Sequence, residues 1–144
     1  MRRLKWCLYL GMTWLALRLL RLLLKVVGYR RTVQVLARLS RTPNRIGYSK
    51  RMLIAARAID RVDHWWPRHP RGCLRRSLLF WWIFRWFGYR SEIRTGVRRE
   101  RGEIEFHAWV ESGGMILNDK ASKISQFAPL WDDISSRIIE GEDS

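Results

Sequence analysis

The chain has 144 residues, a length that fits one domain with a single hydrophobic core. Its 28 Lys and Arg outnumber 13 Asp and Glu, which gives a net charge of +15. Residues 1–59 contain 14 of the basic residues and no acidic one, whereas residues 60–144 are nearly neutral. Two cysteines are too few for a disulfide scaffold, and no secretory cleavage pattern is present, so we expect a reduced, cytoplasmic protein.

The basic N-terminal part indicates an anionic partner, which could be a nucleic acid, a membrane surface or an acidic protein or peptide. A solubilising surface in an Arg-rich composition is the simpler interpretation. A basic nucleic-acid-binding or membrane-binding module without catalysis is therefore one functional hypothesis, and it predicts salt-sensitive binding. We expect no nucleic acid, because Trp81, Trp82 and Trp86 lie in an apolar run that suits a core better than base stacking.

Residues 4–27 predict one amphipathic helix, in which Arg18, Arg21 and Lys25 share a face and most other positions are apolar. These three charges argue against a membrane-spanning helix, and no small-residue cleavage site follows, which argues against a signal peptide. We favour packing onto the rest of the protein or onto a partner. Peripheral contact with a membrane interface is the second interpretation.

Three further segments predict helices, and a fourth predicts a break between two of them. Residues 32–39 predict a short helix, and residues 49–62 predict a longer one that a serine caps. Prolines and glycine in residues 63–72 exclude regular helix. Residues 74–87 predict a helix that is apolar all round at its centre and therefore buried, and Gly88 is expected to end it. The expected buried positions of the 49–62 helix are Met52, Leu53, Ala55, Ala56, Ile59 and Val62.

The C-terminal part predicts strands, which gives an α+β fold. Residues 89–98 and 103–111 read as strands joined by a turn, and residues 115–119 read as a partner strand beyond Gly113-Gly114. The tail from Phe127, with Leu130, Trp131, Ile134, Ile138 and Ile139, predicts a last helix. We expect a basic helical N-terminal region over 1–62 and a catalytic core over 63–144. The second strand alternates Ile104, Phe106, Ala108 and Val110 with Glu105, His107, Trp109 and Glu111.

Cys73, His107 and Asp119 form a candidate catalytic triad. Cys73 opens a helix, whose free N–H groups and macrodipole would stabilise a thiolate. His107 on a strand would be the base, and Asp119 would fix its tautomer. His64 and His69 are competing bases in the preceding loop, and Cys7 is expected to be a small buried hydrophobe. We expect neither a metal nor a cofactor.

The contact between His107 and Asp119 depends on the hairpin register. A three-residue loop over 112–114 would place the two residues opposite each other, with Cβ atoms about 5 Å apart. A two-residue loop at Gly113-Gly114 would put them on opposite faces and remove the triad. Asn118 is the neighbouring alternative as an orienting residue, although it alternates to the other face.

Several strings together resemble the leader peptidases of lasso-peptide biosynthesis, which belong to the transglutaminase-like superfamily. They are Cys73-Leu74-Arg75-Arg76-Ser77-Leu78, the apolar helix ending at Gly88, Gly96-Val97, His107-Ala108-Trp109-Val110-Glu111 and Asn118-Asp119. The resemblance implies a papain-like α+β core, with Cys73 as nucleophile, His107 as base and Asp119 as orienting carboxylate. It also implies cleavage of the leader from a ribosomally made precursor peptide through a thioester.

The resemblance further implies two partner proteins. A separate small protein would capture the leader, and the basic N-terminal part is a candidate surface for docking it. A separate ATP-using lasso cyclase would then join the freed amine to a side-chain carboxylate. A transglutaminase-like acyltransferase, which passes the acyl group to an amine, remains the alternative enzyme.

Overall fold

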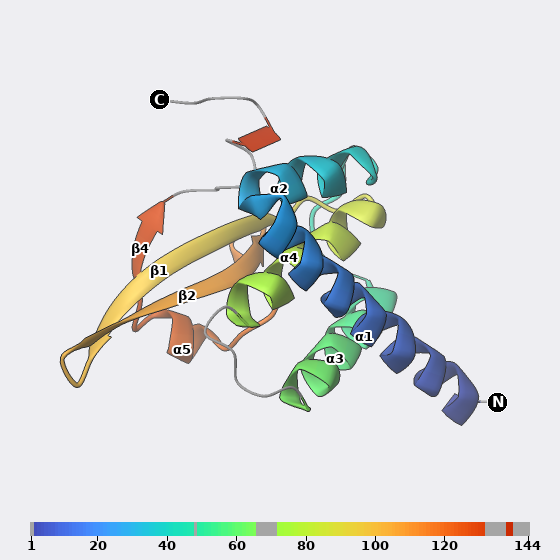
Figure 1. Ribbon diagram of the computed structural model, residues 1–144, viewed down its shortest axis with the longest axis horizontal. Coiled ribbons are helices and arrows are strands. Elements are labelled where there is room, and N and C mark those ends of the chain that lie inside the picture. The colour runs from blue at the N-terminus through green and yellow to red at the C-terminus, as the bar shows by residue number, and fades with distance from the viewer. Residues whose placement is uncertain (1, 48, 66–71, 132–137, 140–144) are drawn as a thin grey trace.

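The computed structural model describes residues 2–47, 49–65, 72–131 and 138–139, and it has an α+β architecture (Figure 1). Helices occupy the first part of the chain, and an antiparallel four-stranded sheet of order β3-β2-β1-β4 follows. The α+β prediction is confirmed. The elements are α1 (Arg2–Val26), α2 (Gly28–Arg38), α3 (Lys50–His64), α4 (Gly72–Trp86), β1 (Glu92–Glu100), β2 (Glu103–Ser112), β3 (Met115–Ile116), α5 (Ala121–Ile124) and β4 (Ala128–Trp131).

Helix α4 is the centre of the molecule, as its apolar sequence predicts. It contacts α1, α2 and α3 on one side and β1 and β2 on the other. The helix ends as predicted at Gly88, whose φ of 80° is readily adopted only without a Cβ atom. The Tyr89 N–H donates to the Phe84 carbonyl and the Gly88 N–H to the Arg85 carbonyl, which is a Schellman motif. Its fully or nearly fully buried apolar residues are Leu78, Leu79, Phe80, Trp81 and Phe84.

The N-terminal helices pack onto this centre. Leu17 and Leu20 of α1 are 0% and 3% exposed and belong to the same core cluster as the apolar residues of α4. The predicted packing of this helix onto the rest of the protein is therefore confirmed. Trp6–Val26 is also long and apolar enough to cross a membrane by length and composition, a test that core helices and signal sequences pass as well. The core joins residues from both sides of position 62, and the division into two regions there stays a prediction.

Helices α2 and α3 differ from their predictions in detail. Helix α2 begins four residues before the predicted start at position 32, directly after α1. In α3, Met52, Ile59 and Val62 are buried as expected, but Leu53 is 44% exposed. The buried face of α3 includes Ala58 and leaves out Leu53, so the prediction that Leu53 is buried is wrong.

Strands β1 and β2 form a long hairpin with Glu100 paired to Glu103. Arg101 and Gly102 have φ of 51° and 89°, so the turn has two residues and left-handed backbone, as tight hairpins prefer. The outer part of the hairpin extends beyond the helices, and Ile104 and Phe106 are 65% and 66% exposed. In the middle of β2 both faces are covered, because α4 packs against one face and the segment from α5 to β4 covers the other.

The predicted C-terminal helix is wrong over Ala128–Trp131. This segment is strand β4, which pairs antiparallel with β1 at the edge of the sheet. Pro129 lies opposite Gly96, at the kind of edge position where a missing N–H is tolerated. Ile134, which the prediction also included, lies outside the described residues.

The hairpin register at 112–114, which the sequence leaves open between a three-residue and a two-residue loop, follows from the strand pairing. Glu111 pairs with Ile116 and Ser112 pairs with Met115, so the loop is the two-residue Gly113-Gly114 turn. Both glycines have positive φ, 56° and 77°, which this turn type requires. Strand β3 then ends at Ile116, earlier than the predicted end at Asp119.

Candidate active site

Cys73 is the second residue of α4 and is partly buried. Its N–H is one of the first four of the helix, which have no acceptor within the helix, and it lies at the positive end of the macrodipole. Cys7 contrasts with it, since it is exposed on α1. The prediction that Cys7 is a buried hydrophobe is therefore wrong, because it lies on the side of α1 that faces away from the core.

Helix α4 meets the edge of β2 at Ala108. Ser77 lies one turn after Cys73, so both side chains share a face of the helix. The Ser77 hydroxyl donates to the Ala108 carbonyl oxygen at 2.9 Å, and the backbone of Ala108 also lowers the pKa of the Cys73 thiol. This contact requires a free strand edge, which exists because β3 pairs only with Glu111 and Ser112.

The Asn118 side chain takes the place of backbone hydrogen bonds beside β2 where β3 has ended. Its Oδ1 accepts the Val110 N–H at 2.8 Å, and its Nδ2 donates to the Ser77 hydroxyl at 3.0 Å. The residue is 6% exposed, so both contacts are buried. Asn118 thereby joins β2, α4 and the segment after β3, and the chain bends at 118–119.

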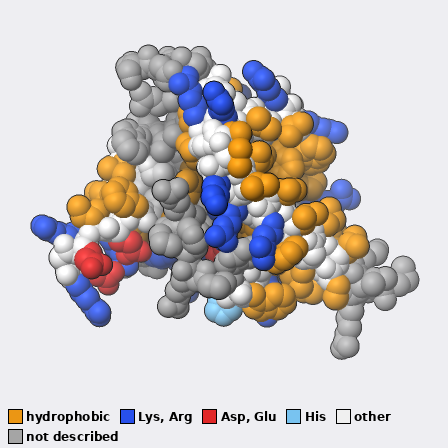
Figure 2. Space-filling model, viewed as in Figure 1, with side chains coloured by type: hydrophobic (Ala, Val, Ile, Leu, Met, Phe, Trp, Pro, Cys, Tyr) orange, Lys and Arg blue, Asp and Glu red, His pale blue; other side chains and the backbone are white. Residues whose placement is uncertain are grey.

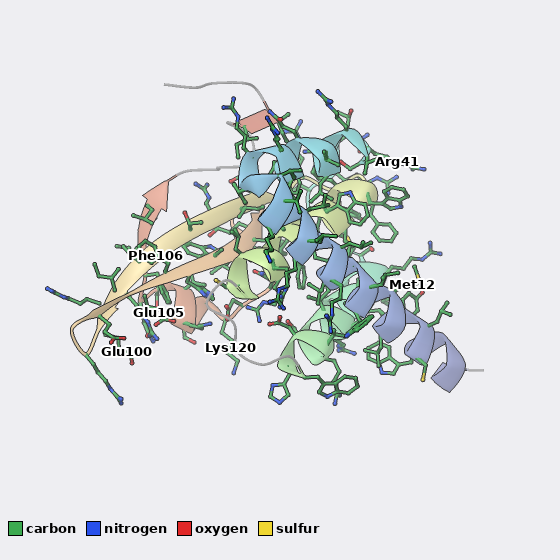
Figure 3. The ribbon with its side chains drawn as sticks, in the orientation of Figure 1. Met12, Arg41, Glu100, Glu105, Phe106 and Lys120 are labelled. Carbon is green, nitrogen blue, oxygen red and sulfur yellow. The ribbon has the colours of Figure 1, made fainter. Side chains whose placement is uncertain are left out.

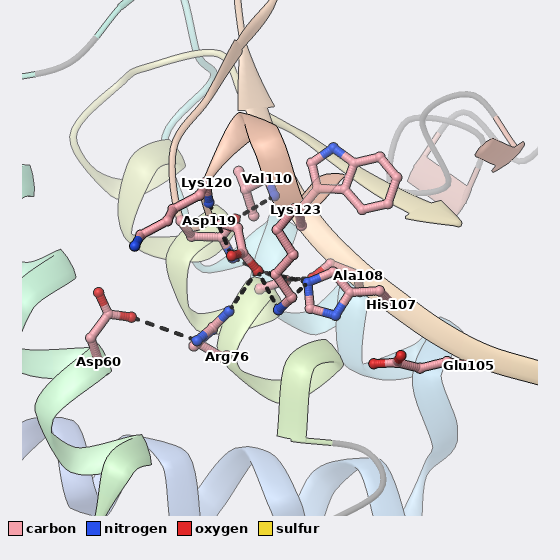
Figure 4. Close-up of polar contacts among 12 residues, drawn as sticks. Asp60, Arg76, Glu105, His107, Ala108, Val110, Asp119, Lys120 and Lys123 are labelled. Carbon is pink, nitrogen blue, oxygen red and sulfur yellow. Dashed lines mark hydrogen bonds and ion pairs between the residues drawn. The ribbon is translucent and has the colours of Figure 1, made fainter. Parts of the chain in front are cut away.

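This bend brings Asp119 to His107 in spite of the register. His107 Nε2 lies 2.7 Å from Asp119 Oδ2 (Figure 4). A continued β3 with the observed register would have put the two residues on opposite faces. Because the strand ends at Ile116, the alternation of faces no longer applies at Asp119.

Aromatic rings fix the imidazole of His107. The Phe127 ring stacks on it with a centroid separation of 5.0 Å, and the Trp109 ring lies at 6.4 Å. Gly96 pairs with His107 across the hairpin, and a Cβ atom there would lie 3.0 Å from the Phe127 Cβ. The glycine thus leaves the space in which Phe127 approaches the imidazole.

The electrostatics favour an ion pair between the thiol and the imidazole. Burial opposes ionisation of Cys73, but hydrogen bonds with His107 and with backbone at Ala108 and Leu74 lower the pKa of the thiol below its ordinary value. Burial likewise opposes the charged form of His107, but hydrogen bonds to Asp119 and Cys73 raise the pKa of the imidazole. Opposite shifts of this kind widen the pH range in which a thiolate and an imidazolium coexist.

Asp119 is surrounded by positive charge. Burial would raise its pKa, but hydrogen bonds from His107, from the Lys120 N–H and from Lys123 hold the pKa of this carboxyl far below its usual range. Its Oδ2 lies 3.2 Å from Arg76 and 3.2 Å from Lys123. Lys123 Nζ is also 3.4 Å from His107 Nε2, where its charge opposes protonation of the imidazole.

Sequence reasoning missed Lys123 and Phe127 as parts of this site. The only available signal for Lys123 is its spacing of four residues from Asp119, which brings two side chains together within a helical turn. For Phe127 no local pattern predicts contact, because it reaches His107 through the turn that follows α5.

Two arginines anchor the start of α4 to α3. The nearly buried Arg75 lies 3.3 Å from Asp63, and Arg76 lies 3.8 Å from Asp60 as well as contacting Asp119. A pocket of about 680 Å³ opens beside Asp119 and is also lined by Asp60, Asp63 and Arg76. Of the competing histidines, the exposed His64 lines this pocket at the end of α3, and His69 lies outside the described residues.

The fold and these contacts define an α+β protein in which a cysteine at a helix start meets a histidine on an antiparallel strand. The chain belongs to the transglutaminase-like superfamily, whose sequence model matches residues 14–132, from within α1 to just beyond β4. This superfamily includes cysteine peptidases and acyltransferases. No curated protein and no solved structure matches the chain.

Proposed function

We propose that this protein is a cysteine peptidase that removes the leader from a ribosomally made lasso precursor peptide, with Cys73 as nucleophile. A separate leader-recognition protein delivers the precursor, and a lasso cyclase uses the product. The observation that carries the proposal is the position of His107, whose Nε2 lies 2.7 Å from Asp119 and whose hydrogen bonding with the Cys73 thiol lowers the pKa of that thiol.

The strings that resemble leader peptidases support the proposal because their polar members share one network. Arg76 and Ser77 from the helix string contact Asp119 and Ala108, and Asn118 links Ser77 to Val110. The strings at 73–78, 107–111 and 118–119 therefore each contribute a group that holds the cysteine, the histidine or the carboxylate. A fold that needed these residues for packing alone would not require a hydrogen-bonded path among these three strings.

The first half of the reaction forms a thioester. The Cys73 thiolate attacks the carbonyl carbon of the scissile peptide bond, and the backbone N–H of Cys73 donates to the oxyanion that results. The His107 imidazolium gives its proton to the leaving nitrogen, and the C–N bond breaks. The C-terminal product departs with a free amine, and the leader stays on Cys73 as an acyl group.

The second half releases the leader. His107 takes a proton from water as the water oxygen attacks the thioester carbonyl. The C–S bond breaks, the leader leaves with a carboxylate terminus, and the Cys73 thiolate is restored. Asp119 keeps the imidazole oriented in both halves and stabilises its charged form, which is the role of a triad carboxylate.

The test is a cleavage assay on the precursor peptide, with and without the separate leader-recognition protein, followed by mass spectrometry. We expect wild type to release leader and C-terminal peptide with one water added, and Cys73→Ala to release neither. Cys7→Ala is the matched control, because that cysteine is exposed and remote from the network, and it should cleave like wild type. Cleavage by Cys73→Ala would overturn the proposal.

Acyl transfer to an amine is the second candidate, because the superfamily includes acyltransferases. It shares the thioester but replaces water by an amine in the second half. If the acyl donor is a glutamine side-chain amide, forming the thioester releases ammonia, and the amine then replaces Cys73. A joined product that weighs the sum of donor and amine less one ammonia, instead of a product that gains water, would support this activity over hydrolysis.

A further inference from the structure

Helix α1 carries a continuous apolar stripe on its outer side. The stripe residues are separated alternately by four and three positions, so they lie above one another along about 27 Å of helix. Figure 3 shows Met12, one of them, extending outward from α1. The stripe comprises Leu8, Met12, Leu15, Leu19, Leu22 and Val26, which are 53–70% exposed.

The opposite face of α1 is part of the core. Leu17 and Leu20 are buried, and Leu10 and Leu24 pack against the same cluster. The helix could cross a bilayer only by leaving α2, α3 and α4, with which it is in contact. An apolar partner must therefore approach the stripe from outside, while α1 remains on the folded protein.

Basic residues lie beside the stripe. Arg18, Arg21 and Lys25 are exposed along one flank of α1. The Arg18 guanidinium lies 4.8 Å from the centre of the Trp14 ring, and paired aromatic and basic side chains of this kind suit the headgroup level of a bilayer. No acidic residue occurs in residues 1–59, which include all of α1 and α2.

The acidic side chains are concentrated away from α1. In Figure 2, hydrophobic side chains and Lys and Arg side chains occupy the side formed by the helices, whereas most acidic side chains in view lie near the tip of the β1–β2 hairpin, together with Lys and Arg side chains. Glu100 and Glu105, labelled in Figure 3, lie on that hairpin. An anionic surface would therefore attract the α1 side and orient the protein with the hairpin directed away.

A second copy of the chain fits the stripe less well. The spacing of the stripe is that of a coiled-coil interface between two helices, in which the charges of the flanking residues favour or oppose pairing. Two copies paired through α1 would bring like charges together, because residues 1–59 offer no carboxylate to either side.

We propose that α1 lies in the plane of an anionic membrane surface, with its apolar stripe at the headgroup–acyl boundary and its basic flank on the lipid phosphates. Helices with this division of faces bind interfaces through buried apolar area and attraction to anionic lipid together. The proposal is independent of the reaction at Cys73, because the stripe lies on the side of α1 opposite the residues that pack into the core with α4.

The test is flotation of the full chain with vesicles made of equal parts phosphatidylcholine and phosphatidylglycerol, or of phosphatidylcholine alone. We expect binding to the anionic vesicles that high salt weakens, and much weaker binding to the neutral ones. The double variant Leu15→Ser, Leu19→Ser should lose at least about tenfold in affinity, because it removes apolar area from the stripe. Both residues are more than half exposed, so the fold should survive.

The control is Ile104→Ser, which removes an apolar side chain of the hairpin that is 65% exposed, more than Leu15 or Leu19, and should bind vesicles like wild type. Unchanged binding by the double variant would overturn the proposal. Concentration-dependent dimerisation that the double variant abolishes would assign the stripe to a second copy instead. Loss of precursor delivery by the leader-recognition protein in vesicle-free solution would assign it to that protein.

Discussion

Replacing Asn118 by Ala tests how the site is held together. The substitution removes the acceptor of the buried Val110 N–H and the donor to the Ser77 hydroxyl. A buried N–H left without a partner costs about 1–3 kcal/mol, and the lost bond to Ser77 adds roughly 0.5–1.5 kcal/mol. We expect a loss of about 2–4 kcal/mol from the free energy of unfolding, a large part of the roughly 5–15 kcal/mol typical of a domain.

The same substitution should impair catalysis, because Asn118 sets the bend that presents Asp119 to His107. A displacement of about 1 Å at a catalytic group can reduce the rate about a hundredfold. Urea unfolding measures the stability, and cleavage of the precursor peptide measures kcat under conditions where the variant is folded. The control is Asn44→Ala, which alters an exposed asparagine and should change neither quantity.

A double-mutant cycle with Ser77→Ala sharpens the test. Asn118 and Ser77 share a hydrogen bond of 3.0 Å, so their effects on unfolding should be non-additive by about 0.5–3 kcal/mol. Wild-type stability and activity in Asn118→Ala, or strict additivity with Ser77→Ala, would refute the role given to this side chain.

Three other experiments test the ionisation of Cys73 and His107 and the packing of the sheet at Gly96. Iodoacetamide should still modify Cys73 near pH 7, where an ordinary thiol with a pKa of about 8.5 is mostly protonated. Peptide mass spectrometry measures the modification of Cys73 and of Cys7 separately, and the same pH dependence at both cysteines would contradict the lowered pKa of Cys73. Asp119→Asn should lower the pKa of His107 towards its ordinary value, so the basic limb of the pH–rate profile moves to lower pH; an unmoved limb would show that the carboxylate does not stabilise the imidazolium. Gly96→Ala places a Cβ atom 2.9 Å from the Ala128 carbonyl oxygen and should destabilise the fold by about 1–3 kcal/mol, whereas Gly11→Ala, in open space within α1, should stabilise it by about 0.5–1 kcal/mol. Thermal unfolding of the two variants tests this, and an unchanged stability of Gly96→Ala would mean that β4 shifts to make room for the Cβ atom.

The helices and the hairpin were predictable because local rules decide them. The run of apolar residues in α4 has no polar face to expose, so burial follows from composition. Gly88 ends the helix because its backbone conformation is strained for other residues. Position 53 of α3 shows the limit of such rules, because a periodic pattern fixes the buried face only to within about one residue.

The register, the tail and the surroundings of Asp119 depend on tertiary contacts that the sequence does not express locally. Both possible loops at Gly113 were consistent with the sequence, and the observed one allows both glycines to adopt positive φ. Strand β4 forms because β1 offers it an open edge, although its apolar residues also suit a helix. Lys123 joins the site only after the chain has bent back beneath β2.

The adjacency of Asn118 and Asp119 explains why the unfavourable register is compatible with the site. The edge of β2 must be free at Ala108 for α4 to bring Cys73 and Ser77 against it, so β3 has to stop early. Stopping early leaves the Val110 N–H without a strand partner, and the Asn118 side chain supplies the acceptor. Because the chain bends at 118–119, the direction of the Asp119 side chain no longer follows the alternation of a strand, and Asp119 reaches His107. A longer β3 would satisfy more backbone groups but would compete with α4 for the same edge of β2. The short strand is therefore a requirement of the site as well as a property of the sheet.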